Sequence, residues 1–285
     1  IPRSCYELEI KSKLGRYRFA QVDGEYMRMK EVKVSSWEAF EVEVTSLFES
    51  VRNRKDATRL YVSEPLFRGH GNSKWKLETT LERYTSDPFE ERACHKVMLR
   101  TVNAVESFTE KAWNLSHEHQ DSKDGPHAPQ GYEFMIYLRH HGFPSPLLDW
   151  TRSPYVAAFF AFRHKPTDGS DNVAVYSYQE DVGGAKGWRS SEPTVFALGP
   201  HVTTHKRHHT QQSEYTICKK QISDTSFYCN HEEAFAKDDR DQDILTKYVI
   251  PVSERAKVLE KLDLMNVNAY SLFGHEESLM ETLAY

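Results

Sequence analysis

The sequence has 285 residues, of which 39% are hydrophobic and 28% are charged. Its 37 Lys and Arg residues against 42 Asp and Glu residues give a formal net charge of −5. This balance excludes a histone-like protein that neutralises DNA over its whole surface, but it allows a local basic face. An aromatic content of 12% exceeds that of disordered chains, and the length suffices for a buried core without a disulfide or metal.

The cysteines and the apolar runs bear on the cellular compartment. Cys5, Cys94, Cys218 and Cys229 lie far apart with no CxxC spacing, which is typical of reduced thiols. The longest apolar runs, such as 154–162, are far shorter than the roughly 20 residues of a membrane span. The N-terminal residues include no apolar signal region. We therefore expect a cytoplasmic protein that does not contact a membrane.

The first 34 residues predict a basic hairpin. Polar and apolar residues alternate on both sides of Asp23-Gly24, which is a turn signal between two strands. Residues 11–33 contain seven Lys and Arg residues against three acidic residues. We expect residues 1–34 to form a basic N-terminal β-hairpin extension, followed by the main domain over residues 35–285.

The remaining chain predicts helices mainly in its first half and strands mainly in its second. Ser35 and Glu38 form a capping box before apolar residues at helical spacing from Trp37, and Ser153-Pro154 is the start signal of an apolar helix. Further helices are predicted from Pro88 toward Trp113 and at 132–141, 253–265 and 275–285, and residues 116–131 are predicted to form a polar loop. Strands are predicted at 60–62, 65–69, 172–178, 194–198, 213–219 and 246–251. This order indicates an α+β fold rather than a doubly wound α/β fold.

Three polar clusters lie in otherwise apolar surroundings, and the first is Phe67-Arg68-Gly69 at the end of a predicted strand. An arginine between an aromatic residue and a glycine can present its planar donors to a phosphate, where the glycine leaves room for a ligand. The alternative is a core arginine that pairs with a carboxylate, for which Asp149 is the candidate. The tripeptide alone leaves both interpretations open.

The second cluster is Asp149-Trp150-Thr151, which leads into the helix start at Ser153-Pro154. A strand that runs into a helix N-terminus offers free N–H groups to an anion, here beside a hydroxyl and an indole face. In the alternative interpretation, Asp149 and Ser153 only cap the helix and Trp150 fills the core.

The third cluster is Gln211-Gln212-Ser213-Glu214-Tyr215 at the start of a predicted strand. Gln212 and Glu214 are two residues apart, so both would point to one face of that strand. An amide beside a carboxylate suits recognition of a hydroxyl and stabilisation of developing positive charge. The alternative is a polar stripe that faces solvent.

Together these segments resemble the FRG domain family, which is named for Phe-Arg-Gly. The resemblance is carried, in chain order, by FRGHGNSKWKLETTLER at 67–83, LRHHGFPSPLLDWTRSPYVAAFFAF at 138–162 and RHHTQQSEYTI at 207–217. The segment LDLMNVNAYSLFGHEESLMETL at 262–283 is similar to the closing segment of that family. The resemblance covers about residues 34–285, so the basic hairpin lies outside it.

The same blocks resemble, more distantly, the Arg, Ser-Thr-Ser and Gln-x-Glu pattern of ADP-ribosyltransferases. Arg68 follows an aromatic residue as in that pattern, residues 149–151 stand where Ser-Thr-Ser would be, and residues 212–214 match Gln-x-Glu. The resemblance implies an α+β domain with an ADP-ribosyltransferase-like split β-sheet core and a helical N-terminal half. It also implies NAD⁺ as co-substrate, without a metal ion. Many FRG domains are similar in having an apolar residue at the position of Glu214. The carboxylate that this sequence has at that position therefore favours an active enzyme.

The resemblance also implies a role for each site residue. Cleavage of the bond between nicotinamide and ribose passes through an oxocarbenium-like species, which Glu214 would stabilise while it binds the ribose 2′-hydroxyl. Arg68 would hold the pyrophosphate or the adenine ribose. The Gly69 backbone would contact the nicotinamide amide, and Asp149 and Trp150 would belong to the NAD⁺ site. Thr151 would contact Glu214 or the ribose, and Gln212 would orient the acceptor. Tyr155 or Tyr215 would stack on nicotinamide.

A histidine-rich basic stretch lies between residues 186 and 220. Histidines recur at four-residue intervals from His201, but no cysteine or acidic fourth ligand is near, so we expect no metal site. The stretch carries six Lys and Arg residues against two Glu residues, and we expect Lys206 and Arg207 to bind nucleic acid. A solvated surface without a partner is the alternative.

The resulting hypothesis is an NAD-dependent ADP-ribosyltransferase that modifies a macromolecule, with RNA or single-stranded DNA as the favoured acceptor. The resemblance implies a bacterial toxin or phage-defence effector, for which a protein antitoxin is the expected partner. The alternatives are a non-catalytic FRG module that binds nucleic acid or protein, and an NAD glycohydrolase that uses water as acceptor. Release of nicotinamide distinguishes both enzymes from the module.

Overall fold

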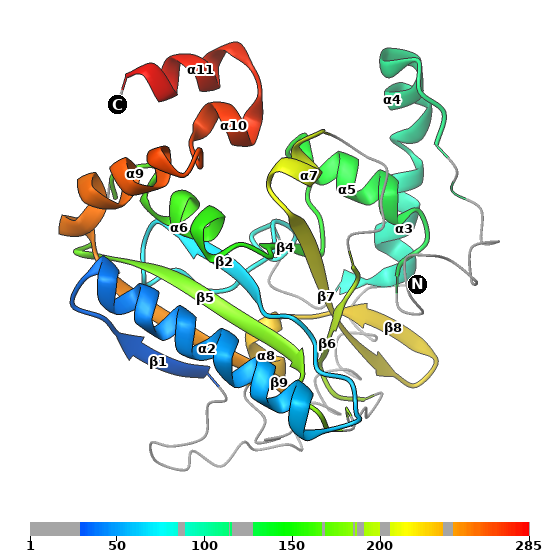
Figure 1. Ribbon diagram of the computed structural model, residues 1–285. Helices are drawn as coiled ribbons and strands as arrows, with labels where there is room; N and C mark the ends of the chain where they lie inside the picture. Colours follow the sequence, from blue (N-terminus) through cyan, green and yellow to red (C-terminus); the bar gives the residue numbers. More distant parts are fainter. Residues whose placement is uncertain are drawn as a thin grey trace.

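Within the described residues, a mostly antiparallel sheet of nine strands, with helices packed against it, organises the fold (Figure 1). The computed structural model describes residues 29–84, 89–113, 115, 128–166, 169–184, 186, 191–199, 206–235 and 242–284. In sheet order the strands are β1 (Met29–Lys33), β9 (Gln242–Pro251), β5 (Asn172–Asp181), β2 (Leu66–His70), β4 (Leu147–Thr151), β7 (Ser213–Ile222), β8 (Thr225–Tyr228) and β3 (Phe89–Glu90), and β6 (Thr194–Ala197) also pairs with β7. The helices are α2 (Trp37–Ala57), α3 (Glu91–Leu99), α4 (Val102–Thr109), α5 (Tyr132–His140), α6 (Pro154–Phe162), α7 (Lys206–Thr210), α8 (His231–Phe235), the 3₁₀ helix η2 (Val252–Glu254), α9 (Arg255–Leu264), α10 (Ala269–Phe273) and α11 (Glu276–Leu283). This mixed architecture agrees with the predicted α+β class.

The sheet is nearly interrupted between β2 and β4. Along its whole length, from Leu66 to His70, β2 pairs with β5, and β4 likewise pairs with β7 over all of its residues. By contrast, β2 and β4 share the single antiparallel pair Phe67–Thr151. Beyond that pair, the backbone polar groups of the two strands need other partners. A side chain of the candidate site described below provides one of these hydrogen-bond partners.

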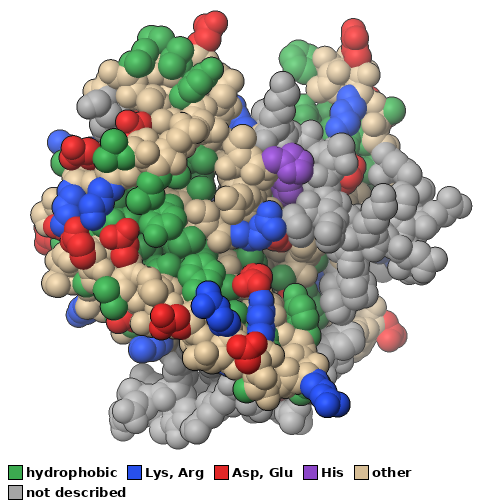
Figure 2. Space-filling view, in the orientation of Figure 1, with side chains coloured by type: hydrophobic (Ala, Val, Ile, Leu, Met, Phe, Trp, Pro, Cys, Tyr) green, Lys and Arg blue, Asp and Glu red, His purple; other side chains and the backbone are tan. Residues whose placement is uncertain are grey.

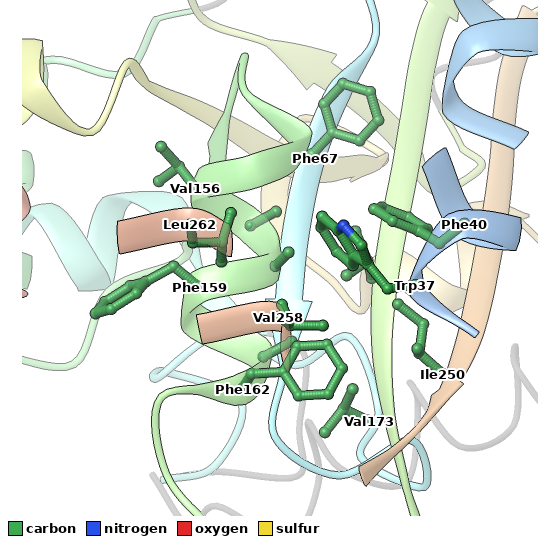
Figure 3. Packing of buried hydrophobic residues seen from close by; sticks show 14 of the residues in the cluster. Trp37, Phe40, Phe67, Val156, Phe159, Phe162, Val173, Ile250, Val258 and Leu262 are labelled. Carbon is green, nitrogen blue, oxygen red and sulfur yellow. The ribbon is translucent and has the colours of Figure 1, made fainter. Parts of the chain in front are cut away.

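Helix α6 forms the centre of a core cluster together with β2, α2 and α9 (Figure 3). The Ser153 hydroxyl accepts the Val156 N–H at 3.3 Å, and Pro154 occupies the first turn, as the sequence predicts. A Cβ atom on Gly69 would lie 1.9 Å from the Ala157 carbonyl oxygen. Gly69 therefore allows the α6 backbone to approach β2, and the space beside it holds a helix rather than a ligand.

Two further core clusters bury the other half of the sheet. One cluster joins α3 and α5 to β7 around Phe134, Ile136 and Ile217. The other joins strands β2, β4 and β5 to α8 around Trp150 and Tyr178. Because neighbouring residues of a strand point to opposite faces, these clusters cover both faces of β4 and β7. The candidate site is thus built on strands that are fixed by packing on each side.

Two predicted helices differ in their boundaries. Helix α2 has Ser36, not Ser35, as its N-cap, since the Ser36 hydroxyl accepts the Ala39 N–H at 3.3 Å. The single helix predicted toward Trp113 is instead the pair α3 and α4, and the second ends at Thr109, with Glu110 as a C-cap whose φ of 55° is left-handed. The propensity of this stretch is helical, but α3 buries Cys94 and Met98 whereas α4 has no buried residue, and the turn lies between the two helices.

Some predictions fall on residues outside the described ranges. The N-terminal hairpin is described only from Met29, where β1 pairs in parallel with β9 and so forms an edge of the main sheet. The helix start at Asp87-Pro88 and the polar residues 116–127 also lie outside them. Among the helices that are described, none has the length and apolar character needed to cross a membrane.

Candidate functional site

Arg68 lies on β2 where that strand separates from β4. Its Nη1 donates a hydrogen bond to the Asp149 carbonyl oxygen at 2.6 Å and lies 3.0 Å from Asp149 Oδ1. Its Nε donates to His70 Nε2 at 3.0 Å. Burial lowers the pKa of Arg68 to about 10, which still leaves the guanidinium charged at neutral pH. The structure thus shows the pairing with Asp149 that was the structural alternative for this arginine.

Arg139 of α5, which the sequence alone did not single out, contacts the same carboxylate. Its Nη2 forms an ion pair with Asp149 Oδ1, and its Nη1 donates to Thr80 Oγ1 at 3.1 Å. Burial, followed by repulsion from Arg68, lowers the pKa of Arg139 to about 9. Arg139 lies within the 138–162 segment that carries the family resemblance, and this place in the sequence is the signal that could have drawn attention to it.

Glu214 lies on β7 directly opposite Trp150 of β4. The residue is 6% exposed, and this burial raises the pKa of its carboxyl to about 7, although the positive charge of Arg152 acts in the opposite direction. The Arg152 Nε atom lies 3.7 Å from Glu214 Oε1, and the Arg152 side chain is 53% exposed. A carboxyl group that ionises near neutral pH can act as a charged electrostatic group or as an acid or base.

Thr151 fixes the segment that precedes Glu214. Its hydroxyl donates to the Gln211 carbonyl oxygen at 2.6 Å and accepts the Ser153 N–H at 3.1 Å. The side-chain amide of Gln211 in turn donates to the Leu272 carbonyl oxygen of α10 at 3.0 Å. Thr151 therefore braces the backbone beside Glu214, and the C-terminal helices support the same segment.

Gln212 does not share a strand face with Glu214 in the way that the sequence predicts. It precedes β7, it is exposed, and its φ of 48° is left-handed. Its N–H donates to the His209 carbonyl at 3.1 Å, and its carbonyl accepts the Arg152 N–H at 3.1 Å. The residue forms a tight turn between α7 and β7, so the two-residue alternation of a strand begins only after it.

The aromatic residues assigned to NAD⁺ binding are core residues. Trp150 is 3% exposed and donates its indole N–H to Thr216 Oγ1 at 2.8 Å. Tyr215 is 1% exposed, and its hydroxyl forms a hydrogen bond of 2.8 Å with His140 Nε2. Tyr155 is partly buried against the cluster of α2 and α6. Trp150 and Tyr215 consequently present no exposed ring face in this structure.

Several basic residues of the 186–220 stretch are paired within the fold. The ion pairs are Lys186 with Glu180 at 2.7 Å, Lys219 with Glu91 at 2.6 Å and Lys220 with Glu233 at 3.7 Å. Arg207 Nε donates to the Phe273 carbonyl oxygen at 3.3 Å. Lys206 lies at the start of α7, and Arg189, His201 and His205 lie outside the described residues. Acidic partners thus neutralise part of the predicted positive face.

The residues Arg68, Asp149, Thr151 and Glu214 lie on three neighbouring strands, β2, β4 and β7, and Arg68 and Asp149 are in direct contact. Figure 2 shows a notch in the surface between the lobe of the C-terminal helices and the side that carries α4, with a histidine and a basic side chain beside it. In Figure 1, α7 and β4 lie below this region. Arg68, Arg139 and Asp149 form one cluster at the junction of β2 and β4. The register of β4 and β7 places the Glu214 side chain on the sheet face of Trp150, opposite to the face of Asp149.

Comparison with known proteins finds one family model that matches part of the chain. Residues 63–170 match the model of the FRG domain. The matched range includes Arg68, Arg139 and Asp149 and ends before Glu214. No curated protein and no solved structure matches the chain.

Proposed function

Residues 63–170 give this chain an FRG domain, and from that premise we propose that the protein is an NAD-dependent ADP-ribosyltransferase. The observation that carries the proposal is the buried carboxyl of Glu214, which lies across β4 from the Arg68–Asp149 junction and ionises near neutral pH. The near-interruption between β2 and β4 supports the proposal, because it resembles the split sheet that the sequence similarity implies.

In the proposed reaction NAD⁺ is the substrate, and the bond between its nicotinamide and ribose C1′ breaks. Nicotinamide leaves with the bonding electron pair, and positive charge develops on the ribose. The ionised Glu214 stabilises this charge and accepts a hydrogen bond from the 2′-hydroxyl. Because Glu214 is only 6% exposed, water screens this interaction weakly. A nucleophile of the acceptor then bonds to C1′ and gives up its proton.

The residues around Glu214 have supporting roles in this proposal. Thr151 positions the carboxyl by holding the preceding backbone through Gln211. Gln212 is exposed directly before β7, so we assign it to contact with the acceptor. Arg152 is half-exposed beside the carboxyl and lowers its pKa, which increases the ionised fraction at neutral pH.

For the acceptor, we propose a single-stranded nucleic acid. Arg152 places an exposed positive charge next to the reacting carboxyl, and the basic segment 11–33 includes the edge strand β1 at its end. A base must leave its stack to reach ribose C1′, which favours single strands over a duplex. The sequence resemblance behind this proposal also implies a toxin or phage-defence role with a protein antitoxin as partner.

Transfer of label from NAD⁺ tests the proposed function. The full chain is incubated with NAD⁺ labelled in its adenylate phosphate and with single-stranded RNA, single-stranded DNA, a duplex of the same sequence, or a cell protein extract. We expect label on a single strand, little on the duplex, and none with Glu214→Gln. The matched control Glu49→Gln changes an exposed carboxylate of α2 and should transfer label normally.

Each other outcome has a defined meaning. Release of nicotinamide without labelled acceptor identifies an NAD glycohydrolase. Label confined to protein contradicts the nucleic-acid acceptor and leaves the transferase in place. Absence of both nicotinamide release and labelled product contradicts the proposed enzyme and favours the non-catalytic FRG module.

A further inference from the structure

Trp75 is an exposed tryptophan on the segment that follows β2. The residue is 56% exposed, whereas the other tryptophans that the structure describes, Trp37, Trp113 and Trp150, are at most 9% exposed. Burial of an indole ring stabilises a fold, because the ring is large and mostly apolar. The fold thus leaves open to solvent a large aromatic surface that a ligand can cover.

The backbone at Trp75 is fixed by hydrogen bonds and by a buried neighbour. The Trp75 N–H donates to the Asn72 carbonyl oxygen at 3.2 Å, and the Trp75 carbonyl oxygen accepts the Tyr176 hydroxyl at 3.3 Å. Leu77, two residues further along the chain, is fully buried. The ring itself lies against Gly71, where an added Cβ would be 3.7 Å from indole Cζ3. The exposed ring is therefore held in one position, which lowers the entropy cost of binding a ligand.

The residues on either side of Trp75 are positively charged. Lys74 and Lys76 are both exposed, and neither forms an ion pair with another residue in the described part of the chain. Lysines elsewhere on the surface differ, as in the pair of Lys257 with Glu38 at 2.7 Å. Two ammonium groups beside an exposed aromatic ring favour a ligand that combines negative charge with a planar apolar part.

Trp75 also adjoins the β2–β4 junction through His70. The two ring centroids are 6.3 Å apart, and His70 Nε2 accepts a hydrogen bond from Arg68 Nε at 3.0 Å. Burial, followed by the positive charge of Arg68 and then of Arg83, lowers the pKa of His70 to about 3. The imidazole is consequently neutral at neutral pH, and positive charges lie around it. The electrostatic surroundings of Trp75 therefore also favour an anion.

Another exposed aromatic residue of the protein lacks these surroundings. Phe108 of α4 is 89% exposed, but the last turn of its helix has no basic residue, and the helix has Glu110 as its C-cap. Exposure of an aromatic ring is thus not sufficient for the arrangement seen at Trp75. The combination of a fixed exposed ring with two flanking lysines distinguishes the segment 74–76.

We propose that Trp75 stacks on a base of a single-stranded nucleic acid, and that Lys74 and Lys76 contact phosphates of the same strand. Every base has a flat face that can stack on an indole, so this contact does not depend on sequence. The lysines add a salt-dependent attraction, because they displace counterions from the phosphates. In a duplex the base faces are stacked on each other, which favours a single strand. The role of this strand as acceptor rests on the proposed function, whereas its binding at Trp75 does not.

Binding of a fluorescently labelled thymidine oligonucleotide to the full chain tests this surface. In an anisotropy titration, Trp75→Ala should weaken binding by roughly tenfold or more, since it removes a stacked base. Trp75→Phe keeps a smaller aromatic ring and should weaken binding less. The control Phe108→Ala removes an exposed ring of α4 and should leave the affinity unchanged. A thermal melt of each variant without the oligonucleotide shows that it is folded.

An abasic strand of the same length separates stacking from charge. This strand keeps the phosphates but offers no base, so the wild type should bind it about as weakly as Trp75→Ala binds the thymidine strand. Trp75→Ala should change the affinity for the abasic strand little. Equal binding of the two strands by the wild type would overturn the proposal. A loss of the same factor for both strands in Trp75→Ala would also overturn it, because Trp75 would then act only through the fold.

The salt dependence of binding tests the two lysines. Replacement of Lys74 and Lys76 by alanine should lower the slope of log affinity against log salt concentration by about 0.7 for each lysine. The matched control replaces Lys257 and Lys261, whose ammonium groups pair with Glu38, and should leave the slope unchanged. The same slope in the wild type and in the variant of Lys74 and Lys76 would overturn the assignment of these lysines to phosphates.

Nicotinamide release by the wild type, measured in parallel, separates this proposal from the proposed function. Strand binding that depends on Trp75, without any nicotinamide release, supports the surface and contradicts the proposed enzyme. Nicotinamide release together with a strand affinity that Trp75→Ala does not change overturns the surface and leaves the enzyme in place. Tighter binding of a duplex than of the single strand, or no binding of the strand by the wild type, would also overturn the surface.

Discussion

Substitution of Glu214 by glutamine should make the protein more stable, by an amount that depends on pH. The carboxyl has an ordinary pKa of 4.5, and burial raises it to about 7 in the folded protein. Between these two pH values the folded state keeps a proton that the unfolded state has released. The free energy of unfolding therefore falls as pH rises through this interval, and the loss is complete above about pH 7.

The magnitude follows from the width of that interval. At 1.36 kcal/mol per pH unit, the interval from 4.5 to about 7 corresponds to about 3 kcal/mol of lost stability at pH 8. Glutamine has a similar shape and no charge to bury, so Glu214→Gln should recover most of this amount at pH 8. It should recover little at pH 4.5, where the wild-type carboxyl is protonated in the folded state.

Urea denaturation at pH 4.5, 6 and 8 measures this difference. The gap between Glu214→Gln and the wild type should grow with pH, by about 3 kcal/mol over the whole range. The control Glu49→Gln removes an exposed carboxylate of α2 and should show a nearly constant gap. A gap for Glu214→Gln that does not change with pH would refute the reasoning, because it would mean that Glu214 ionises in the fold as readily as in the unfolded chain.

Three further predictions follow from the same structure. Nicotinamide release should rise with pH through about 7, since the proposed reaction requires the ionised form of Glu214, and a rate that falls over this range contradicts that role. Arg152→Gln should move the midpoint of this profile to higher pH, because the guanidinium lowers the pKa of Glu214; an unchanged midpoint would show that the two groups are not coupled. Gly69→Ala should lower the free energy of unfolding by about 3 kcal/mol, since its Cβ would lie 1.9 Å from the Ala157 carbonyl oxygen. Gly71→Ala, with its nearest contact at 3.7 Å, should cost much less, and equal losses in urea denaturation would contradict this account of the glycine.

Features with local signals could be predicted from the sequence. Helix α6 begins at Pro154 with Ser153 as its cap, because the cap, the proline and the apolar run are all within one short segment. Strands β5 and β7 begin at Asn172 and Ser213 as predicted, since each has a run of β-branched and aromatic residues. The segments that contain Arg68 and Asp149 also have a local signal, because each places polar residues within a short apolar stretch.

Features that depend on tertiary contacts could not be predicted. Lys219 pairs with Glu91 across 128 positions of the chain, so the sequence of the basic stretch does not reveal that its charge is neutralised. Arg139 joins Asp149 only because α5 packs against β4 and β7. The burial of Trp150 likewise depends on which strand face the helices cover, and alternation along a strand does not specify it.

Nicotinamide release from NAD⁺ by the wild type and by Glu214→Gln tests the central claim most directly. Both proteins are assayed at pH 8, where the wild-type carboxyl is ionised, after a thermal melt has shown that each is folded. We predict that the wild type releases nicotinamide and that Glu214→Gln releases it about 100- to 1,000-fold more slowly, because the charge that stabilises the oxocarbenium-like species is lost. Equal rates in the two folded proteins, or no release by the wild type, would contradict the assignment of this site to NAD⁺ cleavage.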